Sequence, residues 1–401
     1  MAAVYGNVLF YKDCVITQSR FGAVLLFLAT AAWGVPYVPQ DDSAVLERLP
    51  TRPGDPVMAE LRRLRTALAA SPADARNAAR LAQRYFDLAM AEGDPRYVGY
   101  AEAALRPWPG DDAPAEILFT RGLLRQYRHD FAGALKDFER ALERDREHLA
   151  AHAWRAAIFM VQADYSAAAR ECAALTEIAS ELMSTGCFAY VDATIGKTRG
   201  AYLRLAAALE RRPDAPAETR LWSLTRLAEM AWRLGDAPLA ERHFGEALKL
   251  GVTDNFLLAA YADFLLEQGR PKDVVALLQD WVRSDTLLLR LAIAEQALKL
   301  PAARAHSQAL AERFAAAALR NERLHLGEEA RFLLDLKSDA RAALAVGLEN
   351  WKEQREPRDA LVVLEAAIAA RDAKAAAPVL KWLDESRFEG ERMRRAAAAL
   401  R

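Results

Sequence analysis

The sequence of 401 residues has only three cysteines, Cys14, Cys172 and Cys187, and none of them belongs to a C-x-x-C pair. A zinc ribbon, a thioredoxin-like redox motif and a disulfide-dense scaffold are therefore excluded. Neither sign of charge is in excess, because 54 lysines and arginines accompany 55 aspartates and glutamates, for a net charge of -1. A nucleic-acid partner is not expected, since it would need a basic stripe to displace counterions.

The apolar run near the N-terminus is too short for a comfortable membrane span. It reads FGAVLLFLATAA at 21–32, and a span needs about 20 apolar residues. The run follows Lys12 and Arg20 and ends in an A-x-A pattern, Ala29-Thr30-Ala31, which is typical of a secretory signal peptide. An uncleaved anchor is the alternative interpretation.

These features predict a signal peptide over 1–31, followed by a linker and a leading helix over 32–70. They also predict a periplasmic or secreted location. A membrane would be a partner only if the N-terminal segment stays uncleaved.

Alanine is abundant instead. Runs such as Ala206–Ala208 and Ala315–Ala318 have few β-branched neighbours, and alanine loses no side-chain entropy in a helix. The hydrophobic content of 53% is enough for an extensive core, in either several domains or one long array. We therefore expect an all-α chain.

A repeat of about 34 residues indicates one long array and not several separate domains. Gly122 is followed twelve residues later by Ala134, four further on by Phe138 and three further on by Ala141. This ladder of a small, a small, a bulky and a small residue recurs at Ala156, Ala168, Cys172, Leu175; at Ala189, Ala201, Leu205, Ala208; and at Ala228, Ala240, Phe244, Ala247. Looser copies are Ala262, Val274, Leu278, Trp281; Ile293, Ala305, Ala309, Glu312; Ala330, Ala342, Val346, Glu349; and Leu364, Ala376, Leu380, Leu383. Such spacing fits paired helices, because small side chains are needed where two helix axes approach.

Polar turn residues follow the start of several ladders by eight positions. They are Asp130, Asp164, Asp236, Ser338 and Asp372. Short polar side chains of this kind cap helix N-termini, so we expect each to begin the second helix of its pair.

The segments LFTRGLLRQYRHDFAGALKDFERALE at 118–143 and LTRLAEMAWRLGDAPLAERHFGEAL at 224–248 resemble the tetratricopeptide repeat (TPR) family. The resemblance covers about 71–387 and implies a right-handed superhelical solenoid of antiparallel helix pairs. The period count indicates about nine pairs, with degenerate copies after residue 286. Residues 388–401 are expected to form a capping helix, which covers the exposed end of an array.

The resemblance also implies that the first helix of each pair lines a concave groove. The predicted groove residues are Phe119, Tyr127, Met160, Tyr190, Trp222, Glu229, Trp232, Arg233, Phe256 and Asp263. Aromatic, methionine and arginine side chains are typical anchors of protein interfaces, and the cluster of Trp222, Trp232 and Arg233 is the strongest candidate. The alternative is that such side chains pack between helices.

Cys172 and Cys187 fall on neighbouring helices of successive repeats. A disulfide between them can form if the chain is exported, and the alternative is two small buried hydrophobic residues. Gly196-Lys197-Thr198 lacks the rest of a phosphate loop and is interpreted as a turn between helices. His148 and His152 lack the glutamate of a metalloprotease motif, so no metal or cofactor is predicted.

The sequence thus predicts a non-catalytic scaffold or adaptor that binds a protein or peptide outside the cytoplasm. A membrane-tethered assembly factor or regulator with an uncleaved N-terminal anchor is the alternative. An enzyme using the two histidines, or a helical repeat that reads RNA, is less favoured by the motifs and the charge.

Overall fold

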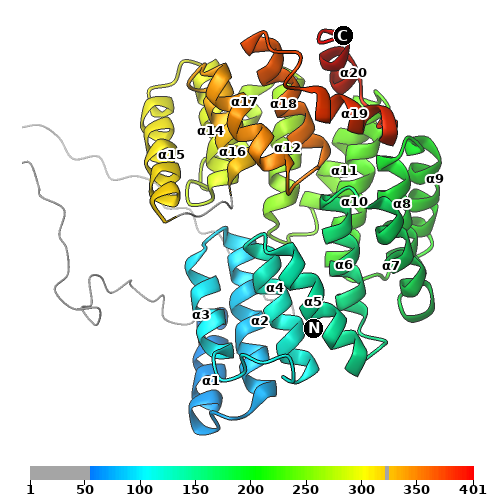
Figure 1. The fold of residues 1–401 in the computed structure, drawn as a ribbon, viewed down its shortest axis with the longest axis vertical. Helices are drawn as coiled ribbons and strands as arrows, with labels where there is room; N and C mark the ends of the chain where they lie inside the picture. The colour runs from blue at the N-terminus through cyan, green and yellow to red at the C-terminus, as the bar shows by residue number, and fades with distance from the viewer. Residues whose placement is uncertain (1–54, 321–324) are drawn as a thin grey trace, which may run out of the picture. The chain divides into compact units, whose positions relative to one another are not determined.

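The computed structural model describes residues 55–320 and 325–401, and the predicted signal peptide at 1–31 lies outside them. The described residues belong to one compact unit, Gly54–Arg401, and form twenty helices and no strand (Figure 1). None of these helices has both the length and the apolar character that a membrane span requires.

The helices follow one another with short connections. They are α1 (Pro56–Ala70), α2 (Ala75–Glu92), α3 (Arg96–Leu105), α4 (Ala115–Tyr127), α5 (Phe131–Arg144), α6 (Leu149–Val161), α7 (Tyr165–Ile178), α8 (Glu181–Thr194), α9 (Thr198–Glu210), α10 (Ala217–Arg233), α11 (Ala237–Leu248), α12 (Asn255–Glu267), α13 (Pro271–Leu278), α14 (Asp285–Ala297), α15 (Ala302–Leu319), α16 (Leu326–Asp335), α17 (Ala340–Trp351), α18 (Pro357–Ala370), α19 (Ala377–Ser386) and α20 (Glu391–Ala398). From α2 to α19 they form nine successive pairs, preceded by α1 and followed by α20. The expected all-α solenoid of helix pairs is confirmed.

Small side chains bring the two helices of a pair together. In the pair α4 and α5, Ala134, Phe138 and Ala141 are fully buried, and the ring of Phe138 lies against Gly122. A Cβ atom placed on Gly122 would lie 2.6 Å from that ring, which is too close for any side chain there. The ladder found in the sequence is therefore the seam along which the helices pack.

One residue in the left-handed region ends the first helix of each of eight successive pairs, from α4 to α18. These residues are His129, Ala163, Gly196, Gly235, Gly269, Lys299, Ser338 and Arg371. In four of the pairs the next residue is an aspartate that accepts a hydrogen bond from a backbone N–H of the second helix: Asp130 from Gly133, Asp164 from Ala167, Asp236 from Leu239 and Asp339 from Ala342. The turn thus ends one helix and caps the next.

Two of the four looser copies are displaced from the predicted register. The other two keep it, because Ala262, Val274 and Leu278 and also Leu364, Ala376 and Leu383 are buried. Ser338 does not cap α17; it occupies the left-handed turn position, and Asp339 accepts the hydrogen bond from Ala342 N at 3.1 Å. The connection between α16 and α17 has four residues, one more than that between α4 and α5. Because of this shift, Ala343, Gly347 and Asn350 are buried in place of Ala342, Val346 and Glu349.

The pair α14 and α15 departs further. Ala305, which the ladder would bury, is exposed, whereas Leu310 and Phe314 are buried in the core. A proline, Pro301, stands at the start of α15 in place of an aspartate cap, and α15 has eighteen residues. The spacing of the clear repeats therefore does not transfer to this pair.

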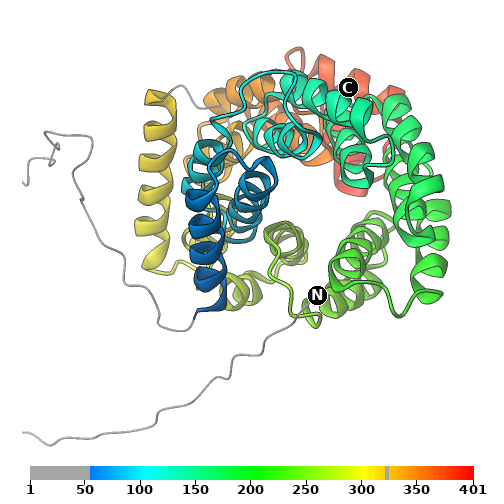
Figure 2. The ribbon, with the colours of Figure 1, turned by 90° about the horizontal axis from the view of Figure 1, so that it is seen from below.

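The C-terminal helices return to the middle of the array. Trp382 Nε1 donates to the hydroxyl of Tyr165 at 2.8 Å, and Thr198 N donates to the carboxylate of Glu389 at 2.8 Å. Two further bonds join C-terminal residues to earlier repeats: Arg355 N donates to Val161 O at 2.7 Å, and Gln354 Nε2 lies 3.0 Å from His129 Nδ1. We call these four bonds the closing contacts. Figures 1 and 2 show the red C-terminal helices beside the green helices of the middle repeats. A plain solenoid lacks such contacts, because its repeats touch only their neighbours.

Substituting Gly122 by alanine tests the helix seam. The new methyl group would collide with Phe138, and overpacking of this kind costs about 1–3 kcal/mol of unfolding free energy. Gly245 on α11 is the matched control, because nothing lies within 4 Å of its Cβ position and alanine there gains about 1 kcal/mol of helix propensity. Urea unfolding followed by circular dichroism should give shifts of opposite sign, and equal midpoints for the two variants would contradict the packing argument.

Candidate functional site

The inner side of the array contains a cavity of about 570 Å³, the size of a small ligand or a short peptide segment. Its lining comes from the first helices of the pairs, α8, α10, α12, α14, α16 and α18, and from α20. Six predicted groove residues line it, namely Tyr190, Glu229, Trp232, Arg233, Phe256 and Asp263. The superhelix thus brings together side chains from these seven helices, with Ala237 at the start of α11 beside them.

The other four predicted residues do not line this cavity. Phe119 is buried against Phe138, with ring centroids 5.7 Å apart, and Met160 is buried in the cluster around Cys172. Tyr127 is half-buried beside Phe86, with ring centroids 6.5 Å apart. Trp222 lies over Gly186 on α8 and keeps 37% of its surface exposed. In α4 and α6 these positions pack between helices, which was the alternative interpretation.

Asp263 of α12 ties three first helices together. Its carboxylate accepts from Arg290 of α14 at 2.6 Å and from Arg331 of α16 at 2.5 Å. Burial alone would raise the pKa of Asp263, but the two guanidinium groups outweigh burial and hold the pKa below its ordinary value. Arg331 also pairs with Asp335 at 3.2 Å, so the wall is joined by a connected set of ion pairs.

Arg226 of α10 lies between two aromatic rings. Its guanidinium carbon is 4.7 Å from the centre of the Tyr190 ring and 4.2 Å from that of Phe256. Its Nη1 pairs with Glu229 at 2.9 Å, and 9% of its side chain is exposed. Cation–π contacts of this kind hold a guanidinium in a fixed orientation. The sequence reasoning missed Arg226, although it precedes Arg233 by seven residues, a spacing that places both on one helix face.

Helix α20 completes the wall. Arg392 donates to both oxygens of Glu365 on α18, at 2.7 and 2.9 Å, and lies 3.5 Å from Glu267 on α12. Glu267 in turn accepts from Trp232 Nε1 at 2.8 Å. The indole of Trp232 is therefore held by a hydrogen bond at its polar end and by an edge contact with Phe264 on its apolar side.

Asp359 is a buried carboxyl group in the same wall. Burial raises the pKa of Asp359 to about 8, although Arg358 beside it acts in the opposite direction. Glu356 N donates to Asp359 Oδ2 at 3.2 Å and forms part of the cap of α18. Burial therefore opposes ionisation of this side chain, which carries less negative charge into the cavity wall than an exposed aspartate would.

The remaining motifs have structural roles. His148 caps α6 by accepting from Ala151 N at 3.3 Å, whereas His152 pairs with Glu171 at 2.7 Å, so the two imidazoles have separate partners. Within the ranges that the structure describes, no three His, Cys, Asp or Glu side chains gather as a metal site. Gly196-Lys197-Thr198 is the turn between α8 and α9.

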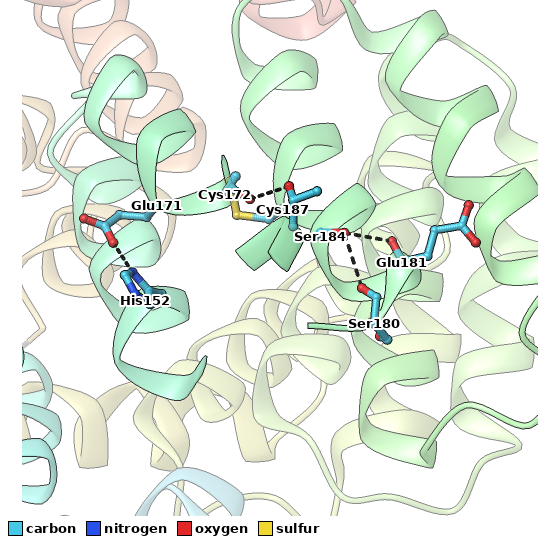
Figure 3. Close-up of a disulfide and its surroundings, with 8 residues drawn as sticks. His152, Glu171, Cys172, Ser180, Glu181, Ser184 and Cys187 are labelled. Carbon is cyan, nitrogen blue, oxygen red and sulfur yellow. Dashed lines mark hydrogen bonds and ion pairs between the residues drawn. A yellow bond between two sulfur atoms is a disulfide. The ribbon is translucent and has the colours of Figure 1, made fainter. Parts of the chain in front are cut away.

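A disulfide joins Cys172 on α7 to Cys187 on α8, with Cα atoms 5.5 Å apart (Figure 3). It lies in a small apolar cluster that also contains Tyr165 and Tyr190. Tyr165 makes a closing contact, and the hydroxyl of Tyr190 lies 3.5 Å from Glu356. The disulfide therefore fixes the junction of two repeats where the C-terminal helices meet them.

Fold and cavity together define a solenoid of TPR-like helix pairs whose first helices surround a charged and aromatic cavity. No protein-family model and no curated protein matches the sequence. Among solved structures, the chain is similar to yeast Tom70, with 14% identity, a TM-score of 0.29, and coverage of 86% of this chain and 92% of that one. It is also similar to the TPR domain of P58(IPK), with 13% identity, a TM-score of 0.21, and coverage of 86% and 92%. A third structure, Naa15/Naa10 bound to HypK-THB, has 13% identity and a TM-score of 0.25, with coverage of 85% and 63%. The fold assignment rests on the helix pairs of this chain and their packing.

Replacing Asp263 by asparagine should lower the unfolding free energy by about 3 kcal/mol at neutral pH, because it leaves the buried Arg290 without its counter-ion. The folded-state pKa of Asp263 is depressed, so its stabilisation is present above the ordinary pKa of 3.8 and is lost as the pH falls through the folded-state value. The stabilities of wild type and variant, measured by denaturant unfolding from pH 7 to pH 2, should therefore converge at the acid end.

The exposed pair of Arg212 and Asp214 supplies the control, because Asp214→Asn should leave stability unchanged across this pH range. A constant difference between wild type and Asp263→Asn down to pH 2 would contradict a role for the ionised carboxylate.

Proposed function

We propose that this chain is a non-catalytic scaffold that binds a protein or peptide segment in the cavity formed by its first helices. The observation that carries the proposal is the composition of the cavity wall, in which Trp232, Phe256 and Tyr190 alternate with ion-paired arginines and carboxylates. Aromatic and arginine side chains held in place by their neighbours are typical interface anchors, because little conformational entropy is lost on binding.

The cavity charges support binding over catalysis. Arg226 is bonded to Glu229, Arg392 to Glu365, and Asp263 to two arginines. These groups therefore already have ionic partners, and they can orient a ligand without acting as acids or bases.

We further propose that the protein acts outside the cytoplasm, in the periplasm or as a secreted protein. The signal-like sequence at 21–32 supports this location, and so does the placement of Cys172 beside Cys187 in bonding geometry, since disulfides persist in oxidising compartments. A membrane-tethered assembly factor, with the same segment retained as an anchor, is the alternative.

Affinity capture from the native source tests the binding site. Trp232→Ala removes an aromatic anchor from the cavity and should reduce the recovered partner at least about tenfold, the effect of losing one hot-spot residue. Trp222→Ala is the matched control, because this tryptophan lies on the same helix but does not line the cavity. Equal recovery by wild type and both variants, quantified by mass spectrometry, would refute binding in the cavity.

The mature N-terminus and the thiol content of protein isolated from its native source test the location. We expect the chain to begin after Ala31 and both Cys172 and Cys187 to resist alkylation without a reductant. An intact N-terminus in the membrane fraction would favour the tethered alternative. Free thiols on both cysteines would count against an oxidising compartment.

A further inference from the structure

Arg233 differs from the ion-paired arginines of the cavity wall. Arg226, Arg290, Arg331, Arg358 and Arg392 each have a carboxylate oxygen within 2.9 Å. Arg233 is half-buried at the end of α10, and none of the described residues places a carboxylate within ion-pair distance of it. A desolvated cation without a counter-ion is unfavourable for folding. Fold stability therefore does not explain why an arginine occupies this position in the wall.

Two carboxylates, those of Glu229 and Glu389, act electrostatically to raise the pKa of Arg233, and both are already bonded elsewhere. Glu229, one turn before Arg233, pairs with Arg226 at 2.9 Å. Glu389 accepts from Thr198 N at 2.8 Å, which is one of the closing contacts. Both carboxylates are therefore engaged in bonds that hold the wall together.

The guanidinium of Arg233 is nevertheless held in place. Its guanidinium carbon lies 4.9 Å from the centre of the Phe388 ring, and its Nη1 donates to the carbonyl oxygen of Ala193 at 3.3 Å. Its Nε is buried without a hydrogen-bond partner, and its Nη2 has no partner among the described residues. The burial that creates this situation also lowers the pKa of Arg233. The terminal nitrogens are the part of the side chain that remains for a ligand.

We infer that Arg233 anchors a carboxylate of the ligand that the cavity binds. The inference rests on the proposed function and specifies its partner: a segment that inserts an aspartate or glutamate side chain. A single carboxylate supplies the missing negative charge and can accept from both terminal nitrogens, since guanidinium and carboxylate match in geometry. A phosphate dianion would place a second negative charge close to Glu229 and Glu389, so the carboxylate is the better fit.

Blocked peptides test the chemistry without knowledge of the partner. Two fluorescent pentapeptide mixtures, acetylated and amidated at their ends, would carry either glutamate or glutamine at the centre and random residues elsewhere. Wild type should bind the glutamate mixture at least about tenfold more tightly than the glutamine mixture, because a charge-assisted bond is worth about 1.5–3 kcal/mol. Arg233→Gln should abolish this preference, and Arg212→Gln, on an exposed loop, should retain it.

The same titration separates the sources of the carboxylate. Glutarate at millimolar concentration should not displace the glutamate peptides if the ligand is a protein segment, whereas displacement would identify a free small acid as the source. Equal affinity of wild type for both mixtures, or binding of neither, would overturn the inference. The proposed function would then be judged separately by whether Trp232→Ala loses its captured partner.

The melting temperature of the ligand-free protein provides a second test. An arginine that only stabilised the fold would give the opposite shift from the one expected here. Arg233→Met should raise the melting temperature of the ligand-free protein by about 1–3 °C, because it removes an unpaired cation and keeps an apolar contact with Phe388. The Ala193 carbonyl would still accept from Thr198 Oγ1 at 3.1 Å. Arg290→Met is the matched comparison and should lower the melting temperature, since it removes one of the two guanidinium partners of Asp263 and leaves only Arg331. A lower melting temperature for Arg233→Met would show that the arginine stabilises the fold and would overturn the inference.

Discussion

Close contact between helices at small side chains determines most of this structure. At Gly122 no side chain fits against Phe138, and at the equivalent seam of α10 and α11 the residues Ala228, Ala240 and Phe244 are fully buried. Such contacts set the distance and crossing of the helices within each pair, and their repetition every 34 residues or so stacks the pairs in a constant order. The first helices therefore come to lie on one side, where their polar and aromatic faces surround the cavity.

Much of the fold could be predicted from the sequence because it depends on local spacing. The ladder, the aspartate caps and the period all arise from residues less than one repeat apart. The prediction lost its register in α14–α17 and regained it in α18 and α19, where Leu364 and Ala376 are buried. One additional residue in the turn before Asp339 moves the ladder positions of α17 by one. In α14 and α15 the seam is built from Leu310 and Phe314 instead of small residues, and no spacing rule identifies it.

Less of the candidate site than of the fold could be predicted from the sequence. Six of its residues follow from the periodicity of the first helices, but periodicity alone could not distinguish Phe119 and Met160, which face neighbouring helices, from residues that face the cavity. The ion pairs that give the cavity its character connect different repeats: Asp263 meets Arg290 and Arg331 across 27 and 68 residues. Such partners become visible only when the superhelix brings the repeats together, and so does the lack of a counter-ion at Arg233.

The closing contacts change how the array should fold. Their partners are 191 to 225 residues apart in the chain for the bonds Thr198–Glu389, Tyr165–Trp382 and His129–Gln354. Helix pairs form from local contacts, which are quick to assemble, whereas joining segments this distant carries a large loop-closure entropy and forms late. In an open array the terminal repeats fray independently of the centre. Here the last repeats are bonded to the middle ones, so fraying at the C-terminal end must first break contacts with helices formed some 200 residues earlier, and unfolding becomes more cooperative than nearest-neighbour stacking alone would make it.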